Sequence, residues 1–139
     1  MSDLYRIFDV AGSAMSAQSV RLNTTASNLA NANSVSSSAG ATYRARQPVF
    51  AAELNNAMGG QQDSVGVKVM GIVESKKPLV KEYNPDHPMA DKDGFIYKPN
   101  VNVVEEMTNM ISASRSYQTN VQVTDVAKQM LLRTLQLGQ

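Results

Sequence analysis

The uneven distribution of proline is the feature that most constrains how this chain can fold. All five prolines, from Pro48 to Pro99, lie in the middle of the 139 residues, together with six of the eight glycines. Because a proline inside a helix costs about 3 kcal/mol, long helices are possible in both flanks but not in the middle. We therefore predict a mainly α protein in which two long terminal helices flank a small, irregular β-rich insertion.

The N-terminal flank carries large apolar residues at heptad spacing, which is typical of a helix that packs along one side. Phe8, Met15, Leu22 and Leu29 are seven apart, and Leu4 precedes that row by four residues. The spacing predicts one helix from Asp3 to about Asn31.

An Asn-rich stretch is predicted to end that helix. Asn tolerates the left-handed conformation that closes a helix, and its side chain can bond the free carbonyls of the last turn or bridge to neighbouring segments. We interpret Asn28, Asn31 and Asn33 as the helix stop, and Pro99 and Asn100 as the turn that leads into the second helix.

The C-terminal flank repeats the heptad pattern nearly to the end of the chain. One row is Val103, Met110, Tyr117, Thr124 and Leu131, and its companion row is Met107, Ser114, Val121, Lys128 and Leu135, with Ile111, Val126 and Leu132 broadening the stripe. Asn100 or Asn102 is the expected N-cap, and the two glutamates that follow suit the positive end of the helix dipole. We expect the two helices to form an antiparallel, coiled-coil-like pair.

The middle of the chain reads as short strands. Val65, Val67 and Val69 alternate with other residues, which predicts a strand, and residues 76–84 could form its return strand. An Asp93-Gly94 turn is expected beside a short aromatic strand, and residues 55–64 read as a flexible loop. The expected division is a discontinuous helical domain, residues 1–35 with 100–139, and a β-rich outer domain, residues 36–99.

The scarcity of charge in the N-terminal flank favours helices that pack against other molecules. Its first 35 residues contain four charged side chains, whereas a helix with one face in water usually carries more. A two-helix hairpin packed within one monomer is the plainer alternative. However, two long helices and a thin middle make a poor single core, and the apolar tip around Leu131 and Leu135 is expected to need a partner.

Composition excludes several classes of function. A net charge of +1 gives no electrostatic case for binding nucleic acid or a membrane surface, and the absence of Cys excludes disulfides and Cys-ligated metals. No segment approaches the roughly 18 apolar residues of a membrane span, and the N-terminus lacks the pattern of a cleavable signal peptide. These facts alone predict a soluble cytoplasmic protein.

Catalytic signals in the sequence are few and weak. The one histidine, His87, lies near Asp86, Asp91 and Asp93 at spacings that match no metal-ligand pattern, and the stretch lacks the ligands of an EF-hand loop. There is no nucleophile elbow, phosphate-binding loop or dinucleotide fingerprint. We therefore expect no enzyme activity, no metal, no cofactor and no small-molecule substrate.

Taken together, the two ends resemble the axial proteins of the bacterial flagellar rod and hook. The N-terminal signature is the Asn-Leu-Ala-Asn-Ala-Asn element at residues 28–33. The C-terminal signature comprises residues 99–102, Glu106-Met107 and the group Arg115, Tyr117 and Asn120. The resemblance covers essentially the whole chain, and its short middle is most similar to that of proximal rod proteins.

The resemblance implies a structural subunit that leaves the cell through the flagellar type III export apparatus without a cleaved signal. Its terminal helices would pack with copies of itself and other rod proteins into a shaft that crosses the periplasm and transmits motor torque to the hook. Basal-body components that join the rod to the membrane ring are further implied partners. The expected assembly interface is Leu4, Phe8, Met15, Leu22, Leu29, Val103, Met107, Met110, Ile111, Tyr117, Val121, Leu131 and Leu135.

Two other classes of function remain open from the sequence. A helical-hairpin adaptor or secretion chaperone would use the same two helices to hold partner proteins. A metal-binding or sugar-binding activity of the middle segment is the third possibility.

Overall fold

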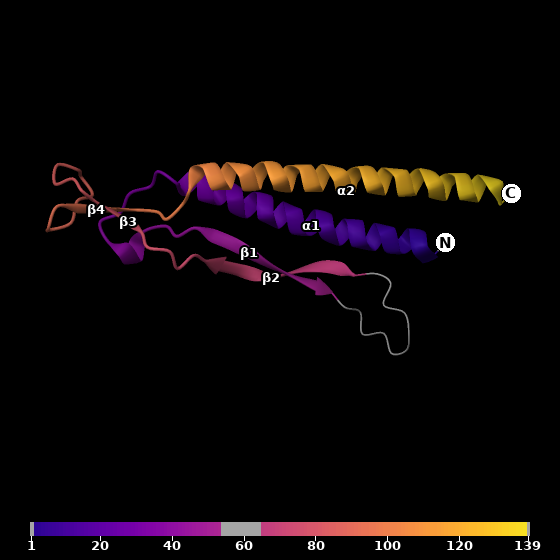
Figure 1. Ribbon diagram of the computed structural model, residues 1–139, viewed down its shortest axis with the longest axis horizontal. Helices are drawn as coiled ribbons and strands as arrows, with labels where there is room; N and C mark the ends of the chain where they lie inside the picture. Colours follow the sequence, from indigo (N-terminus) through magenta and orange to yellow (C-terminus); the bar gives the residue numbers. More distant parts are fainter. Residues whose placement is uncertain (1, 54–64, 139) are drawn as a thin grey trace.

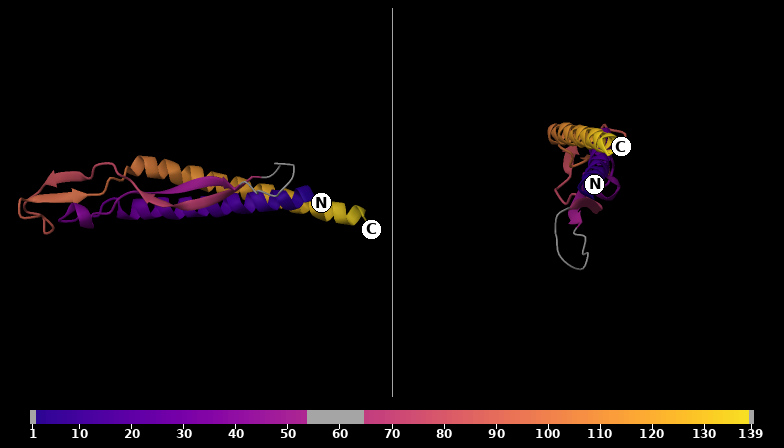
Figure 2. Two further views of the ribbon diagram at one scale, coloured as in Figure 1. Left: turned by 90° about the horizontal axis from the view of Figure 1, so that it is seen from below. Right: turned by 90° about the vertical axis from the view of Figure 1, so that its right-hand side faces the viewer.

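Two long helices lie side by side and form most of an elongated molecule (Figure 1). The computed structural model describes residues 2–53 and 65–138, in which α1 spans Ser2–Asn31 and α2 spans Val103–Leu137. Both chain ends lie at the same end of the molecule, so the helices run in opposite directions, and α2 extends past the start of α1 (Figure 2). The prediction of two long terminal helices around a small β-rich middle is confirmed.

The helix boundaries follow from the polar residues at their ends. Asn102 is the N-cap of α2, and its side-chain oxygen accepts a hydrogen bond from the backbone N–H of Glu105 at 3.2 Å. This satisfies one of the free donors of the first turn. Asn31 is the last residue of α1, and its side-chain amide donates to the carbonyl of Ser27 at 2.8 Å. The structure thus selects Asn102, not Asn100, as the N-cap.

A long β-hairpin lies against α1 on the side opposite α2 (Figures 1 and 2). Strand β1, Arg46–Glu53, pairs antiparallel with β2, Gly66–Glu74, and the register shifts between Val49 and Phe50. The hydroxyl of Ser13 in α1 accepts a hydrogen bond from the backbone N–H of Val67 at 3.1 Å and joins the hairpin to the helix. The prediction that residues 76–84 form the return strand of β2 is therefore wrong, because β2 pairs with β1, which precedes it in the chain.

The second hairpin forms the far end of the molecule. Strands β3, Val80–Tyr83, and β4, Phe95–Lys98, pair antiparallel, and a short 3₁₀ turn, Ala39–Ala41, lies between α1 and β1. Gly94 has φ +83° in the predicted turn, and a Cβ there would lie 2.9 Å from the Tyr83 ring. The carboxylate of Asp91 accepts hydrogen bonds from two backbone N–H groups of the same turn. The loop expected at residues 55–64 lies outside the described residues.

The core within the described residues is thin. Its buried hydrophobic side chains are Ala11, Ala17, Ala45, Ile96, Ala113 and Ala127. Alanines allow helix backbones to approach closely but bury little apolar area, and hydrophobic stabilisation scales with that area. Many larger apolar side chains stay exposed, so the fold leaves much of its apolar surface for contacts outside the chain.

Candidate assembly surface

Two asparagines, Asn28 and Asn100, hold the connection between the helical and β parts of the chain. We call this connection, Asn28 and Asn100 with Ala45 and Arg46, the neck. Asn28, which is 1% exposed, accepts hydrogen bonds from the backbone N–H of Arg46 at 2.9 Å and the hydroxyl of Tyr43 at 2.7 Å. Its amide donates to the Arg46 carbonyl at 2.8 Å. The Asn28 side chain therefore pairs with Arg46 in both directions, as a neighbouring strand would.

Asn100 binds the backbone N–H of the residue before Arg46 and two carbonyls of the segment after β2. Its side-chain oxygen accepts from the backbone N–H of Ala45 at 2.7 Å, and its amide donates to the carbonyls of Ser75 and Lys77 at 3.3 and 2.9 Å. These two residues were predicted as part of the helix stop and turn. The structure adds long-range bonds that join both helix ends to the start of β1.

Asn33, by contrast, is exposed, and its side chain makes no hydrogen bond with any residue that the structure describes. Pro99 is buried and directly precedes Asn100.

The face of α2 that meets α1 is lined by small and polar side chains. Glu106, Ala113 and Ala127 are buried, with Asn120 partly buried between them, so a heptad row faces α1. The sequence placed the companion row one residue later, at Met107, and that residue is 54% exposed. One residue turns a helix by about 100°, so the apolar members of the expected row point sideways.

The predicted interface residues of α2 are mostly exposed in the single chain. The exposed ones are Val103, Met107, Ile111, Tyr117, Val121 and Leu135, whereas Met110 and Leu131 are partly buried. Sequence reasoning missed three further exposed apolar residues, Val104, Val123 and Met130. Val104 has the highest exposure of the three, 74%. The signal for them was present, because all three are large apolar residues without a place in the heptad rows.

The predicted interface residues of α1 are partly buried. These are Leu4, Phe8, Met15, Leu22 and Leu29. α1 lies between α2 and the β1–β2 hairpin (Figures 1 and 2), so two of its sides are covered. That position explains why small and uncharged residues such as Ala17, Thr24 and Thr25 are the buried ones.

Polar groups are included in the contact between the helices. Arg21 of α1 donates a hydrogen bond to the side-chain oxygen of Asn109 at 3.3 Å, and the side-chain oxygen of Gln18 is buried with no partner among the described residues. Glu106 is 5% exposed in the first turn of α2, where the N-terminal end of the helix dipole favours a carboxylate. The helix pair therefore lacks the dry apolar seam of a strong coiled coil.

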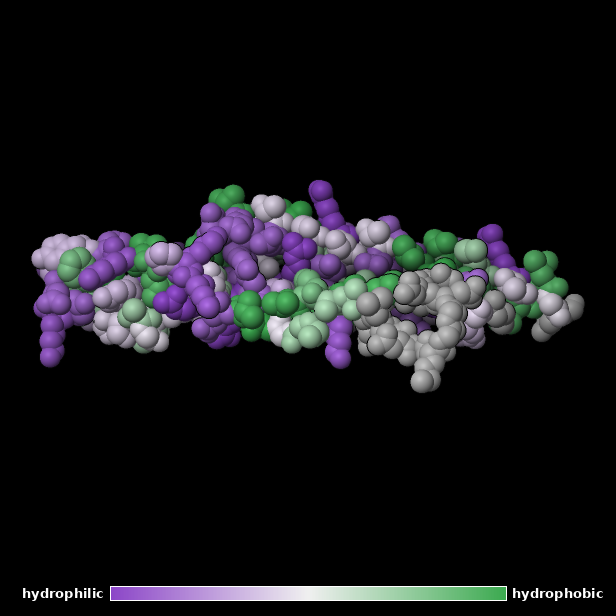
Figure 3. Space-filling model, turned by 60° about the horizontal axis from the view of Figure 1, so that its bottom comes forward, coloured by the Kyte–Doolittle hydropathy of each residue, from purple (hydrophilic) through white to green (hydrophobic). Residues whose placement is uncertain are grey.

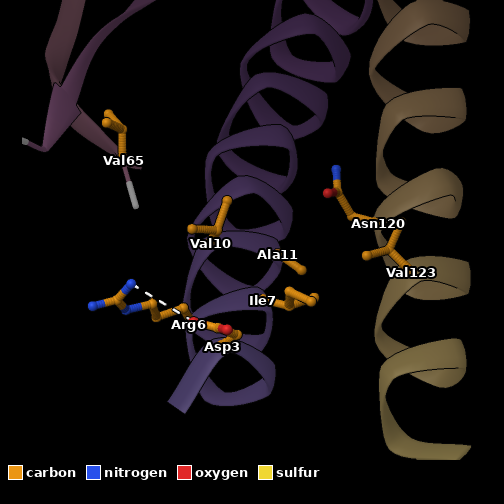
Figure 4. Close-up of a pocket in the computed structure, with 8 residues that line it drawn as sticks. All are labelled: Asp3, Arg6, Ile7, Val10, Ala11, Val65, Asn120 and Val123. Carbon is orange, nitrogen blue, oxygen red and sulfur yellow. Dashed lines mark ion pairs between the residues drawn. The ribbon is translucent and has the colours of Figure 1, made fainter. Parts of the chain in front are cut away.

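Two adjoining grooves lie where the start of α1 meets the second half of α2. Figure 4 shows Ile7 and Ala11 pointing toward α2, where Asn120 and Val123 point back at them. This groove has a volume of about 550 Å³, and an ion pair between Asp3 and Arg6, at 3.8 Å, lies at its edge. The second groove, of about 290 Å³, continues past Ile7 and Val123 and is lined by Val126, Ala127 and Met130.

A further apolar surface covers the outer side of the hairpin. Figure 3 shows hydrophobic residues gathered along β1 and β2 and again at the end of the molecule where α2 terminates. Met70, Ile72 and Val73 are each more than half exposed. A two-stranded hairpin is marginally stable by itself, so this face is suited to contact with another molecule.

The residues around His87 form turns. The Nδ1 atom of His87 accepts a hydrogen bond from the backbone N–H of Met89 at 3.0 Å, and Asp91 bonds the turn described above. Across residues 2–53 and 65–138 there is no group of three or more His, Cys, Asp or Glu side chains that could hold a metal ion. Within the same ranges no helix is long and apolar enough to cross a membrane.

Two family descriptions match the two ends of the chain. The family described as "Flagella basal body rod protein" matches residues 8–36, which cover most of α1 and the Asn-rich stretch. The family described as "Flagellar basal body rod FlgEFG protein C-terminal" matches residues 92–137, which cover β4 and α2. The paired terminal helices and these matches define the class as structural proteins of the flagellar basal-body rod.

Full-length relatives narrow the class. The chain is 52% identical to the flagellar basal-body rod protein FlgC of Salmonella typhimurium and 53% identical to that of Escherichia coli O157:H7, in each case over 98% of both chains. It is 35% identical to the FlgC of Borreliella burgdorferi over the same share of each chain. The chain belongs to the family of the flagellar basal-body rod protein FlgC. It is a structural subunit of the rod and not an enzyme.

Proposed function

We propose that this chain builds the proximal part of the rod through its terminal helices. In this proposal, residues 1–35 and 100–139 form the inner tube and residues 36–99 form an outer layer. The helices pair as an antiparallel, coiled-coil-like unit and contact copies of the chain and other rod proteins. The observation that carries the proposal is the reversal of the usual pattern in α2, which buries alanines and exposes large apolar residues.

Burial of that exposed surface would stabilise an assembly. A large apolar side chain contributes about 1.5–3 kcal/mol when it is moved fully from water into a packed interface. α2 exposes such residues along its whole length, from Val104 to Leu137. An assembly of this kind transmits motor torque to the hook through many small contacts repeated in every subunit.

Membership of the family supports the remaining parts of the proposal. The chain is exported through the flagellar type III apparatus without a cleaved signal peptide and reaches a rod that crosses the periplasm. Basal-body components that join the rod to the membrane ring contact its outer side. The β1–β2 hairpin is on the side of α1 away from α2 (Figure 1), and its exposed face supplies an apolar surface for such a contact (Figure 3).

The test uses the exposed tip of α2. Leu135 is 50% exposed, so Leu135→Asp should leave the circular dichroism and melting of the purified chain unchanged. In an assembled tube the same carboxylate would be buried without a partner, at a cost of several kcal/mol in every subunit. We expect loss of swimming and of incorporation into purified basal bodies.

Gln136→Asp is the matched control, because it places the same charge on the next, exposed residue of the helix. It should retain swimming. Normal incorporation of Leu135→Asp would contradict assembly through the tip of α2. Loss of helix in the free Leu135→Asp chain would favour the adaptor instead.

A further inference from the structure

Two exposed apolar stripes on α2 have the same internal spacing. The first stripe is Val104, Met107 and Ile111, and the second stripe is Val123, Val126 and Met130. Each stripe follows the i, i+3, i+7 pattern of one helix face, and each member of the second lies 19 positions after its counterpart. All six side chains are more than 40% exposed.

The stripes lie on different flanks of the helix. Met107 follows the buried Glu106 by one residue, whereas Val126 precedes the buried Ala127 by one residue. Because one residue turns a helix by about 100°, the two side chains lie on either side of the face that meets α1. A neighbouring molecule on each flank would therefore meet a different stripe.

The two stripes also differ in their surroundings. The second stripe faces Ile7 of α1 across a groove of about 290 Å³, so it forms one wall of a hollow. No residue lining the hollow is charged, and the charged residues within the spans of the two stripes, Glu105, Glu106, Asp125 and Lys128, belong to neither stripe. Contact between the stripes would consequently bury no unpaired charge.

We propose that the first stripe of one copy docks in the groove of a second copy, with the two α2 helices parallel and shifted by 19 residues, or about 28 Å. This inference rests on the proposed assembly through the terminal helices and names the surfaces that meet. The shift places Val104 beside Val123, Met107 beside Val126 and Ile111 beside Met130. The two surfaces differ, so the contact is heterologous, and each added copy presents a free stripe to the next.

The absence of Cys from the chain allows a direct test by engineered disulfides. A chain carrying both Met107→Cys and Val126→Cys is expressed in cells that lack the wild-type chain, and assembled basal bodies are oxidised. A ladder of cross-linked copies is expected on non-reducing gels. Within one helix these residues are about 28 Å apart, whereas disulfides need Cα atoms within about 7 Å, so any bond between them joins two copies.

Two controls test whether cross-linking depends on the 19-residue shift between the two α2 helices. Either cysteine alone should give no ladder. Met107→Cys with Ser112→Cys should also give none, because Ser112 precedes the buried Ala113 by one residue and so shares the flank of Val126 without the 19-residue shift. Ile111→Cys with Met130→Cys repeats the test at a second matched position. Swimming and incorporation are measured for each variant, and the ladder is scored in the pair that incorporates.

The outcomes separate this inference from the proposed function. A ladder for the shifted pairs and none for the controls supports the inference. Incorporated chains without a ladder, a ladder with Ser112→Cys, or cross-links to a different rod protein would each overturn it. These results leave the proposed function standing, since that proposal is tested independently by the incorporation of Leu135→Asp.

Discussion

Replacement of Asn28 tests how the neck holds the two parts of the molecule together. Asn28→Ala removes one acceptor and one donor that serve Arg46, while the Tyr43 hydroxyl keeps a second partner, the Ser27 hydroxyl, at 3.2 Å. Two backbone groups then lose their partners, at about 1–3 kcal/mol each. The better helix propensity of Ala returns about 0.7 kcal/mol. The expected loss of folding free energy is therefore about 1–5 kcal/mol.

Urea denaturation followed by circular dichroism measures this loss. We expect a lower midpoint with an unchanged slope, because a change in stability alone moves the midpoint. Asn33→Ala is the matched control from the same Asn-rich stretch, since Asn33 is exposed and should change the free energy by less than about 0.5 kcal/mol. Equal midpoints for the two variants would refute the reasoning, because they would show that Asn28 is not docked on Arg46 in the free chain.

Two further substitutions test the packing of the helices and the far end. Ala113 is 0% exposed in the helix pair, so Ala113→Leu should destabilise the chain by about 1–3 kcal/mol through overpacking. Thermal melting measures this loss, with Ser112→Leu on the exposed side as the control. A stability equal to that of the control would disprove the close approach of the helices. Gly94→Ala places a Cβ 2.9 Å from Tyr83 at φ +83° and should cost at least about 1 kcal/mol in the same assay, whereas Gly40→Ala meets open space and should not. A wild-type melt for Gly94→Ala would show that the turn adopts another backbone conformation.

The sequence was sufficient to predict the helices because the relevant signals are local. Proline is absent from both flanks, and a cap such as Asn102 acts within one turn of its helix. The end of α1 at Asn31 also agrees with the prediction. The partner of β2 was missed because β1 contains Pro48, which reads as a break in a strand. A two-stranded sheet has only edge strands, and there proline is tolerated.

The orientation of α2 could not be predicted from apolar periodicity alone. The sequence placed Met107 and Val121 in the helix pair because large apolar residues usually point to a core. The structure buries Ala113 and Ala127 instead, since small side chains allow α1 to approach. Glu106 is buried in the same row, in the first turn of α2, where the helix dipole favours a carboxylate. In a chain that assembles, apolar residues pack either within the subunit or against neighbouring subunits. One sequence does not show which residues serve which of these contacts. Likewise, a side chain such as Asn28 shows its helix position but not its distant partner.

In the neck, the backbone N–H groups of two adjacent residues are hydrogen-bonded by different parts of the chain. The N–H of Ala45 is bonded by Asn100, which directly follows the β-rich segment, and the N–H of Arg46 is bonded by Asn28 of α1. Exchange of these two amide protons with solvent therefore reports two separate events. Slow exchange of the Arg46 amide proton indicates that α1 is docked on β1 through Asn28. Slow exchange of the Ala45 amide proton indicates that the segment before α2 is docked through Asn100. Hydrogen exchange at this one dipeptide thus shows separately whether α1 and the segment before α2 are docked on the start of β1.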